Sequence, residues 1–288
     1  MNWRGNVGVL GIALCAWCAT ASAQAPELEN YRARMAATVD VVLEQIRPAL
    51  DADATKVLDH LVIETRASWD TNALARKGLG KKRVVVLNSG LLVYTEWLTL
   101  AMIAEGAGHE GCLRDYTEFL SDRAGADREG SGFIDFARTT RGHCEGAHLD
   151  VLDEKSQEYR DRILESVVAT VLLHEIGHHV LGHIPTRGNN LYHARLREMA
   201  ADQWAVQVAV DSNYDLRPAV PMFLVLDTID RTSFVEEIRK SHPSGLHRIR
   251  DLLVQTRTLL EKKSSPDAHS MDTSIRDLDR ALQYNPRP

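Results

Sequence analysis

Two histidines and a glutamate stand at the spacing of a catalytic metal site in the segment His174 to His178, which reads His-Glu-Ile-Gly-His. On an α-helix, residues i and i+4 lie on the same face about one turn apart, so His174 and His178 can offer two imidazole nitrogens to one Zn²⁺. Glu175 would then point toward a water molecule on the metal. This spacing predicts a zinc hydrolase that acts through an activated water.

The residues around this motif are typical of a buried helix. An apolar run without Pro or Gly extends from Arg160 to Ile176, and Gly182 and Pro185 follow as helix-ending residues. The alternative is a core helix with two structural histidines. Two buried imidazoles and a carboxylate cost several kcal/mol unless something pairs them, and a bound metal provides that pairing.

A catalytic zinc site needs a third protein ligand and keeps one position for water. His179 and His183 point away from the motif face of a helix, so we expect neither to bind the metal, and we expect His183 to be structural. Glu198 and Asp202 share one face of the next predicted helix. We expect Glu198 to bind the metal and Asp202 to accept a hydrogen bond from a metal-bound imidazole. The alternative for this pair is a solvated helix face.

The first 23 residues have the features of a cleaved signal peptide. Arg4 precedes an apolar stretch at 7–19 that is too short to span a bilayer, and Ala21-Ser22-Ala23 is a small-x-small cleavage site. We therefore expect an exported protein, in the bacterial periplasm, without an integral membrane span in the mature chain.

Charge and composition favour a polypeptide as the partner. The formal net charge is −6, and acidic and basic residues are interspersed along the chain. This balance predicts neither nucleic acid nor an anionic membrane surface as a partner. The length is sufficient for one sizeable domain with its own core. Nothing in the composition predicts the oligomeric state.

Two of the four cysteines fall in the expected signal peptide, and the other two are Cys112 and Cys144. In an oxidising compartment these two are expected to form a disulfide. The alternative is a second metal site, although the spacing matches no zinc knuckle or ribbon. Its ligands would be His109, Cys112, His143, Cys144 and His148.

Hydrophobic periodicity predicts a mainly α-helical (α+β) protein with a small β element. Two amphipathic helices are predicted between Glu27 and Trp69, separated at Pro48. A β-branched run at 84–87 predicts a strand, followed by a helix at 91–104. Further helices are predicted at 191–210, 216–229 and 246–260.

The stretch 106–150 holds 8 of the 18 glycines and both remaining cysteines, so it is predicted to be a loop-rich insertion. Its place before the motif helix is compatible with a flap over the site and equally with an inert solvated loop. The insertion or the tail at 273–288 would then cover the zinc, with a disulfide coupling that cover to redox state.

Three separated blocks resemble the M48 zinc metallopeptidases. They are the His174 to His178 motif with the later His183, the pair Glu198 and Asp202, and the stretch His242-Pro-Ser-Gly-Leu-His-Arg248. Residues 88–92, Asn-Ser-Gly-Leu-Leu, resemble the strand-to-helix step that the family places before its motif helix. With the signal peptide, the likeness is to the soluble exported branch, HtpX-like gluzincins without membrane spans. It covers residues 80–100 and 160–260, and the long insertion departs from it.

The resemblance implies a zincin-like helical metalloprotease domain with one Zn²⁺ held by the two motif histidines and Glu198. It implies an endopeptidase for exported proteins, misfolded or from the envelope, with Glu175 as the general base. It also implies that His242 stabilises the oxyanion and that Arg248 orients a nearby carboxylate or closes the site, with Asp202 as a supporting residue. The alternatives are a zinc-stabilised, chaperone-like binding protein with a latent site and a zinc hydrolase with a non-peptide substrate.

The domain boundaries expected from these patterns follow the chain in order. A signal peptide occupies 1–23 and an N-terminal helical segment 24–78. The metallopeptidase domain extends over 79–262 with its insertion at 106–150, and a polar linker with an amphipathic tail occupies 263–288.

Overall fold

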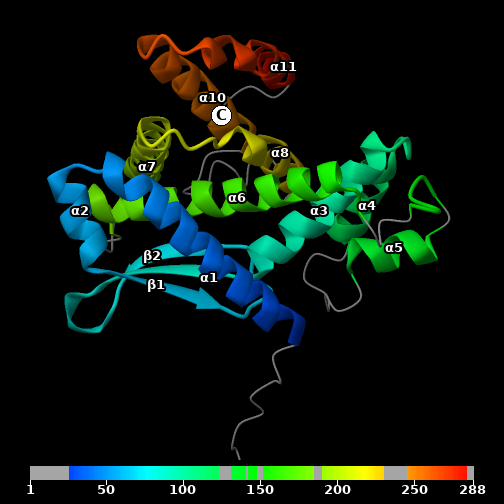
Figure 1. Ribbon diagram of the computed structural model, residues 1–288, viewed down its shortest axis with the longest axis horizontal. Helices are drawn as coiled ribbons and strands as arrows, with labels where there is room; N and C mark the ends of the chain where they lie inside the picture. The colour runs from blue at the N-terminus through cyan, green and yellow to red at the C-terminus, as the bar shows by residue number, and fades with distance from the viewer. Residues whose placement is uncertain are drawn as a thin grey trace, which may run out of the picture.

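The structure is a computed structural model that describes residues 26–122, 131–140, 142–147, 152–184, 190–229 and 245–283. The expected signal peptide, His148 and His242 lie outside these residues. Helices dominate the described chain, and three strands form one small sheet (Figure 1), which confirms the predicted mainly α fold class. None of the helices within the described ranges has the length and apolar character that crossing a bilayer requires.

The N-terminal helices follow the predicted break at Pro48. Helix α1 extends over Pro26–Ile46, a single 3-10 turn covers Arg47–Ala49, and α2 covers Ala52–Asp59. The Asp51 carboxylate accepts a hydrogen bond from the backbone N–H of Ala54 at 2.7 Å and so caps α2. The apolar stripe of α1 faces the core and is fully buried, at Met35, Val39, Val42 and Ile46.

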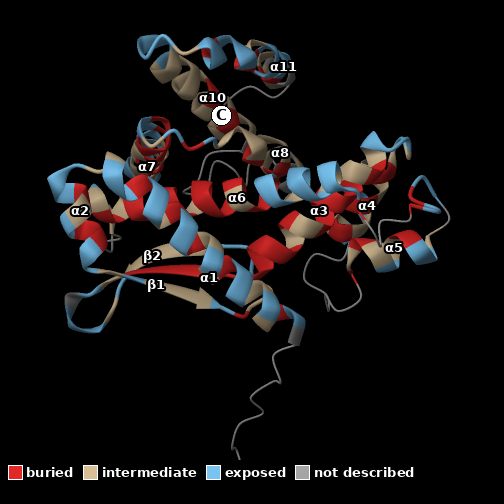
Figure 2. Cartoon of the chain, in the orientation of Figure 1, coloured by how far each residue is buried: buried red, intermediate tan, exposed pale blue. Residues whose placement is uncertain are grey.

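The sheet contains β1 (Leu61–Arg66), β2 (Ala73–Lys77) and β3 (Arg83–Asn88) in the order β1-β3-β2. The central strand β3 pairs in parallel with β1 and antiparallel with β2. Residues 84–87 of β3 are almost completely buried, which is the environment that a run of Val and Leu requires (Figure 2). The prediction of this strand is confirmed.

The prediction of a helix reaching Trp69 was wrong, because Leu61–Arg66 is β1. Leu58, Leu61 and Val62 recur at three- and four-residue spacing, which indicates a helix when read locally. The pairing with β3, about twenty residues later, determines the strand. The strand β2 was also not predicted from the sequence.

Helix α3 (Gly90–Gly106) begins directly after β3. The backbone N–H of Gly90 donates to the Ser68 carbonyl at 2.7 Å. A Cβ atom at Gly90 would lie 2.3 Å from the Trp69 carbonyl oxygen, so a side chain has no room there. This close approach joins the ends of β1 and β3 at the start of α3.

The insertion is more ordered than its glycine content suggests. It contains α4 (Cys112–Asp122) and α5 (Phe133–Thr139), joined by an aromatic cluster in which Tyr116 and Phe133 are fully buried. The Tyr116 hydroxyl donates to the Ser131 carbonyl at 2.7 Å. Cys112 and Cys144 form the predicted disulfide, so these two thiols are not ligands of a second metal site.

Helix α6 (Glu154–Val180) carries the metal motif and crosses the centre of the molecule (Figure 1). The Asp153 carboxylate caps it by accepting from the backbone N–H of Ser156 at 2.8 Å. At its other end Gly182 adopts a φ of 70°, and the N–H of His183 donates to the carbonyl of His178 at 2.8 Å. Gly182 therefore ends the helix, as predicted.

The described residues that follow α6 form helices and short connections. The helical elements are α7 (Leu191–Asp211), a 3-10 turn (Arg217–Ala219), α8 (Val220–Ile229), α10 (Gly245–Lys262), the 3-10 helix η4 (Pro266–Met271) and α11 (Asp272–Gln283). A small second core joins α10 to η4 and α11 through Ile249, Leu253, Met271, Ile275 and Leu278. Residues 266–271 thus pack against α10, where the sequence predicted a polar linker.

Candidate metal centre

The crossing of α6 and α7 brings two histidines and a glutamate together. His174 Nε2 lies 3.1 Å from Glu198 Oε2, and His178 Nε2 lies 3.4 Å from Glu198 Oε1. The two Nε2 atoms are 3.0 Å apart. One potential ligand atom from each of the three residues lies within 4.8 Å of the other two. Among the described residues, these three side chains are the group of His, Cys, Asp or Glu that is close enough to share one metal ion.

This arrangement suits a cation better than a set of hydrogen bonds. Two imidazole nitrogens face each other and the same carboxylate, and the side chains of His174 and Glu198 are each about nine-tenths buried. Two nitrogen ligands and one carboxylate oxygen are the donor set of many catalytic zinc sites, which leave a fourth position for water. The residues present therefore fit a divalent metal ion such as Zn²⁺.

Asp202 and Arg248 fix the ring of His174 from the side away from this group. His174 Nδ1 lies 2.8 Å from Asp202 Oδ1, so its N–H donates to the carboxylate and leaves Nε2 for a metal. Arg248 makes two hydrogen bonds to Asp202, from Nε to Oδ2 at 2.9 Å and from Nη2 to Oδ1 at 2.7 Å. Helices α6, α7 and α10 thus meet in one chain of contacts.

The charges around Asp202 keep it ionised. Burial raises the pKa of Asp202, but the Arg248 guanidinium and the hydrogen bond from His174 outweigh this effect and lower the pKa from 3.8 to about 2. Burial also lowers the pKa of His174, whereas its hydrogen bonds to Asp202 and Glu198 raise it from 6.5 to about 9. Without a metal, His174 is therefore a cation at neutral pH.

Glu175 follows His174 on α6 and is buried, with 8 % of its surface exposed. Burial lowers the pKa of Arg248, but Asp202, and more weakly Glu198 and Glu175, raise it above its ordinary value. The Glu175 carboxylate thus acts on the same guanidinium as the metal-site carboxylates.

Sequence reasoning missed Gly177, which sets the distance between α6 and α7. A Cβ atom at this position would lie 3.2 Å from both the Ala201 carbonyl oxygen and Trp204 Cε3. The missing side chain lets α7 approach α6 closely enough for the Glu198 carboxylate to reach both histidines. A glycine within a predicted helix, where it weakens helix formation, was the available signal.

His179 was set aside as a ligand, and the structure gives it a different contact. Its Nε2–H donates to the carbonyl of Val84 in β3 at 3.0 Å, and its side chain is fully buried. Burial lowers the pKa of His179, so the ring is neutral. This hydrogen bond ties the motif helix to the sheet one residue after His178.

His183 lies beyond the end of α6 and outside the metal group. Its ring centroid is 5.6 Å from that of His178, and burial lowers its pKa. His242, the predicted oxyanion residue, lies outside the described residues.

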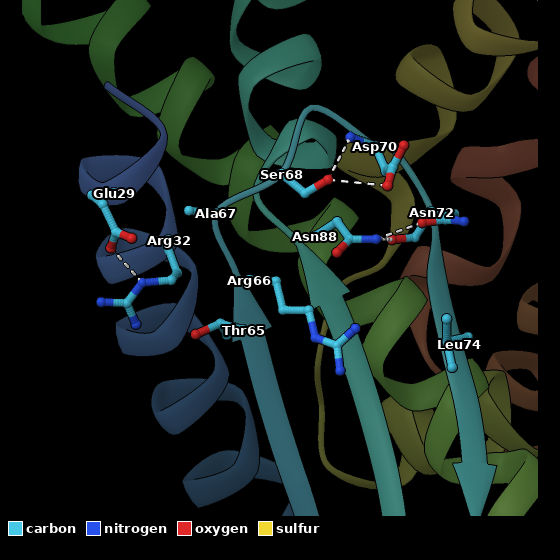
Figure 3. Close-up of a pocket in the computed structure, with 10 residues that line it drawn as sticks. All are labelled: Glu29, Arg32, Thr65, Arg66, Ala67, Ser68, Asp70, Asn72, Leu74 and Asn88. Atoms are coloured by element: carbon cyan, nitrogen blue, oxygen red, sulfur yellow. Dashed lines mark hydrogen bonds and ion pairs between the residues drawn. The ribbon is translucent and has the colours of Figure 1, made fainter. Parts of the chain in front are cut away.

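A separate open pocket of about 550 Å³ lies at the ends of β1 and β3 (Figure 3), and no metal-site residue lines it. Some of its charged and amide side chains pair with one another. Arg32 bonds Glu29 at 2.6 Å, and Asn88 Nδ2 donates to Asn72 Oδ1 at 2.5 Å.

The model of one protein family, described as Peptidase family M48, matches residues 186–256. The match includes Glu198, Asp202 and Arg248 and begins after the His174 to His178 motif. No curated protein and no solved structure matches the chain significantly.

Proposed function

Because the match of residues 186–256 supports an M48 family metallopeptidase, we propose that the chain is a zinc-dependent endopeptidase that hydrolyses exported proteins. The observation that carries this proposal is the meeting of His174, His178 and Glu198 around one point, beside a general base on the same helix. The finer parts of the proposal are the identity of the metal as zinc, the export of the chain to the periplasm, and misfolded or envelope proteins as substrates.

When bound by His174, His178 and Glu198, a zinc ion supplies a Lewis acid that polarises the scissile carbonyl and lowers the pKa of water. Glu175 then takes the proton from the attacking water and passes it to the leaving amine. A scaffold that needed only the metal would have no use for a buried carboxylate next to a ligand, so Glu175 favours catalysis over a purely structural site.

Asp202 and Arg248 act as positioning residues in this proposal. The Asp202 carboxylate holds the Nδ1–H tautomer of His174, at 2.8 Å, and Arg248 holds that carboxylate with two hydrogen bonds. A ligand whose ring cannot rotate keeps its Nε2 electron pair directed at the metal. We further propose that His242 stabilises the oxyanion of the tetrahedral intermediate, an assignment that rests on the sequence block alone.

The first test compares the chain from residue 24 with its Glu175→Gln variant, with zinc content and casein cleavage measured for both. We expect one zinc per chain in each and cleavage by the wild type alone, because glutamine keeps the shape of the side chain but cannot take a proton. Glu158→Gln, an exposed position on the same helix, is the matched control and should cleave like the wild type.

If both proteins hold zinc and neither cleaves unfolded casein, the endopeptidase proposal fails and the binding function takes its place. If neither protein holds zinc although both are folded, the metal assignment fails as well.

A further inference from the structure

The turn between β2 and β3 gathers positive charge on an acidic protein. Residues 76–83 read Arg-Lys-Gly-Leu-Gly-Lys-Lys-Arg, so five of these eight residues are basic and none is acidic, whereas the whole chain has a formal net charge of −6. We call residues 76–83 the basic hairpin. Although the charges balance along the chain, the fold places this set at one end of the sheet, where β2 ends and β3 begins.

The basic hairpin projects from the molecule with a leucine in its turn. Leu79 is 93 % exposed, the highest value among the large hydrophobic residues of the described chain. The turn is closed by a hydrogen bond from the N–H of Gly78 to the carbonyl of Lys82 at 2.7 Å, and Gly80 has a φ of 66°. The loop between β2 and β3 lies at the lower left of Figure 1, and Figure 2 shows exposed residues in it.

Two of its lysines are available to a partner. Lys77 and Lys82 are exposed, and neither has an ion-pair partner within the described residues. Arg76, by contrast, pairs with Glu64 of β1 at 3.1 Å. The hairpin thus presents an apolar side chain next to two uncompensated cations.

We propose that the basic hairpin docks the protein on an anionic phospholipid surface, with Leu79 entering the interface and Lys77 and Lys82 contacting headgroup phosphates. An exposed leucine gains by entering the interfacial region, and nearby lysines add electrostatic attraction to anionic lipids. Nucleic acid is the less suitable occupant, because residues 73–88 contain no aromatic side chain on which a base could stack.

This docking has a consequence for the metal centre. The carbonyl of Val84, one residue after the hairpin, accepts the hydrogen bond from His179 of the motif helix. The strand β3, which continues the hairpin, is thus hydrogen-bonded to α6, so a docked hairpin would hold the metal helix at a fixed place relative to the bilayer. Substrates would then be polypeptides exposed at the membrane surface; this statement rests on the proposed function, whereas lipid binding does not.

The test is cosedimentation of the chain from residue 24 with vesicles of phosphatidylglycerol and phosphatidylcholine in equal parts, and with vesicles of phosphatidylcholine alone. We expect binding to the anionic vesicles that weakens as salt is added. The double variant Lys77→Gln/Lys82→Gln should reduce the partition coefficient by on the order of tenfold or more. Leu79→Ser should weaken binding as well, because the interfacial contact is lost.

The matched control is Lys155→Gln/Lys262→Gln, which removes the same charge at two exposed positions on other elements and should bind like the wild type. Circular dichroism and zinc content establish that each variant is folded. No binding to anionic vesicles, or equal loss in the control, would overturn the proposal. The proposal would also be overturned if vesicle binding depended on the lysines but not on Leu79 and the protein also bound single-stranded DNA. The hairpin would then be a general polyanion site. Vesicle binding is measured without a substrate, so a protein without peptidase activity can still confirm the lipid-binding proposal.

Discussion

At the residue scale, the metal centre depends on how Asp202 and Glu198 share His174. Each ring nitrogen of His174 faces a carboxylate, Nδ1 toward Asp202 at 2.8 Å and Nε2 toward Glu198 at 3.1 Å. In the metal-free protein both nitrogens are best occupied by N–H groups, which explains the pKa of about 9. A metal ion must displace the proton on Nε2.

This competition predicts that zinc affinity rises with pH. In the metal-free protein, His174 carries protons on both ring nitrogens up to about pH 9. The association constant for zinc should therefore increase by about tenfold per pH unit from neutral pH to that value. Asp202→Asn removes the charge that favours protonation, so the variant should show a weaker pH dependence and an affinity lower by about 10- to 100-fold at pH 9. Competition with a chromophoric chelator measures both quantities, and an equal pH dependence in the two proteins would contradict this account.

The same shift predicts the opposite trend for the stability of the metal-free chain. The pKa of His174 is higher in the folded protein than its ordinary value of 6.5. Its stabilising contribution is therefore fully present below pH 6.5 and is lost as pH rises through about 9. Urea unfolding of the same two metal-free proteins should show this loss in the wild type, and less of it in Asp202→Asn.

At the element scale, the distance between α6 and α7 decides whether the site forms, and Gly177 controls that distance. Gly177→Ala should improve the intrinsic helix preference of α6 by about 1 kcal/mol. The new methyl group, however, would meet the Ala201 carbonyl and Trp204 at 3.2 Å, and such overpacking costs about 1–3 kcal/mol. We expect lower stability and weaker zinc binding. Gly106→Ala, where no atom lies within 4 Å of the added Cβ, is the control and should be neutral or stabilising in chemical denaturation; stabilisation by both would refute the packing argument.

The sequence predicted most elements that have a local signal. The apolar run before His174 and the glycine at 182 located the motif helix, and the β-branched run located β3. Two strands could not be predicted in this way. Strand β2 is a five-residue edge strand that contains no β-branched residue. Strand β1 is an edge strand whose partner β3 begins about twenty residues later in the chain. The contact between His179 and Val84 is hidden for the same reason, since 95 residues separate the two.

The residues of the candidate site likewise differ in whether local sequence could predict their contacts. The i, i+4 spacing of His174 and His178 is local information. The approach of Glu198 depends on how closely α6 and α7 cross, and Gly177 permits this close approach. The sequence alone does not show which helix packs against Gly177. Arg248 was expected to orient a nearby carboxylate or to close the site, and in the structure it makes two hydrogen bonds to Asp202. Arg248 was suggested by the resemblance of the stretch His242 to Arg248 to the M48 family, and hydrophobic periodicity alone did not suggest it.

At the scale of the whole molecule, the disulfide-bonded insertion and the metal helices belong to one hydrophobic core but to different parts of it. Helices α4 and α5 pack on α3, and α4 also contacts α8. The residues of the candidate metal centre come from α6 and α7, and Arg248 comes from α10. The bond between Cys112 and Cys144 therefore links two parts of the insertion, and Tyr116 and Phe133 are buried in the same core.

This separation predicts that the disulfide supports stability without regulating the metal centre. Cys112→Ala/Cys144→Ala should lower the free energy of unfolding by about 2–4 kcal/mol, because a closed loop between positions 32 residues apart no longer restricts the unfolded chain. Zinc affinity and the rate of casein cleavage, measured well below the unfolding temperature, should equal those of the wild type. The wild type treated with reductant should behave like the double variant. If removal of the bond instead changes the cleavage rate while stability and zinc affinity stay constant, the insertion is a redox-controlled cover of the site, and the role of the disulfide is regulatory.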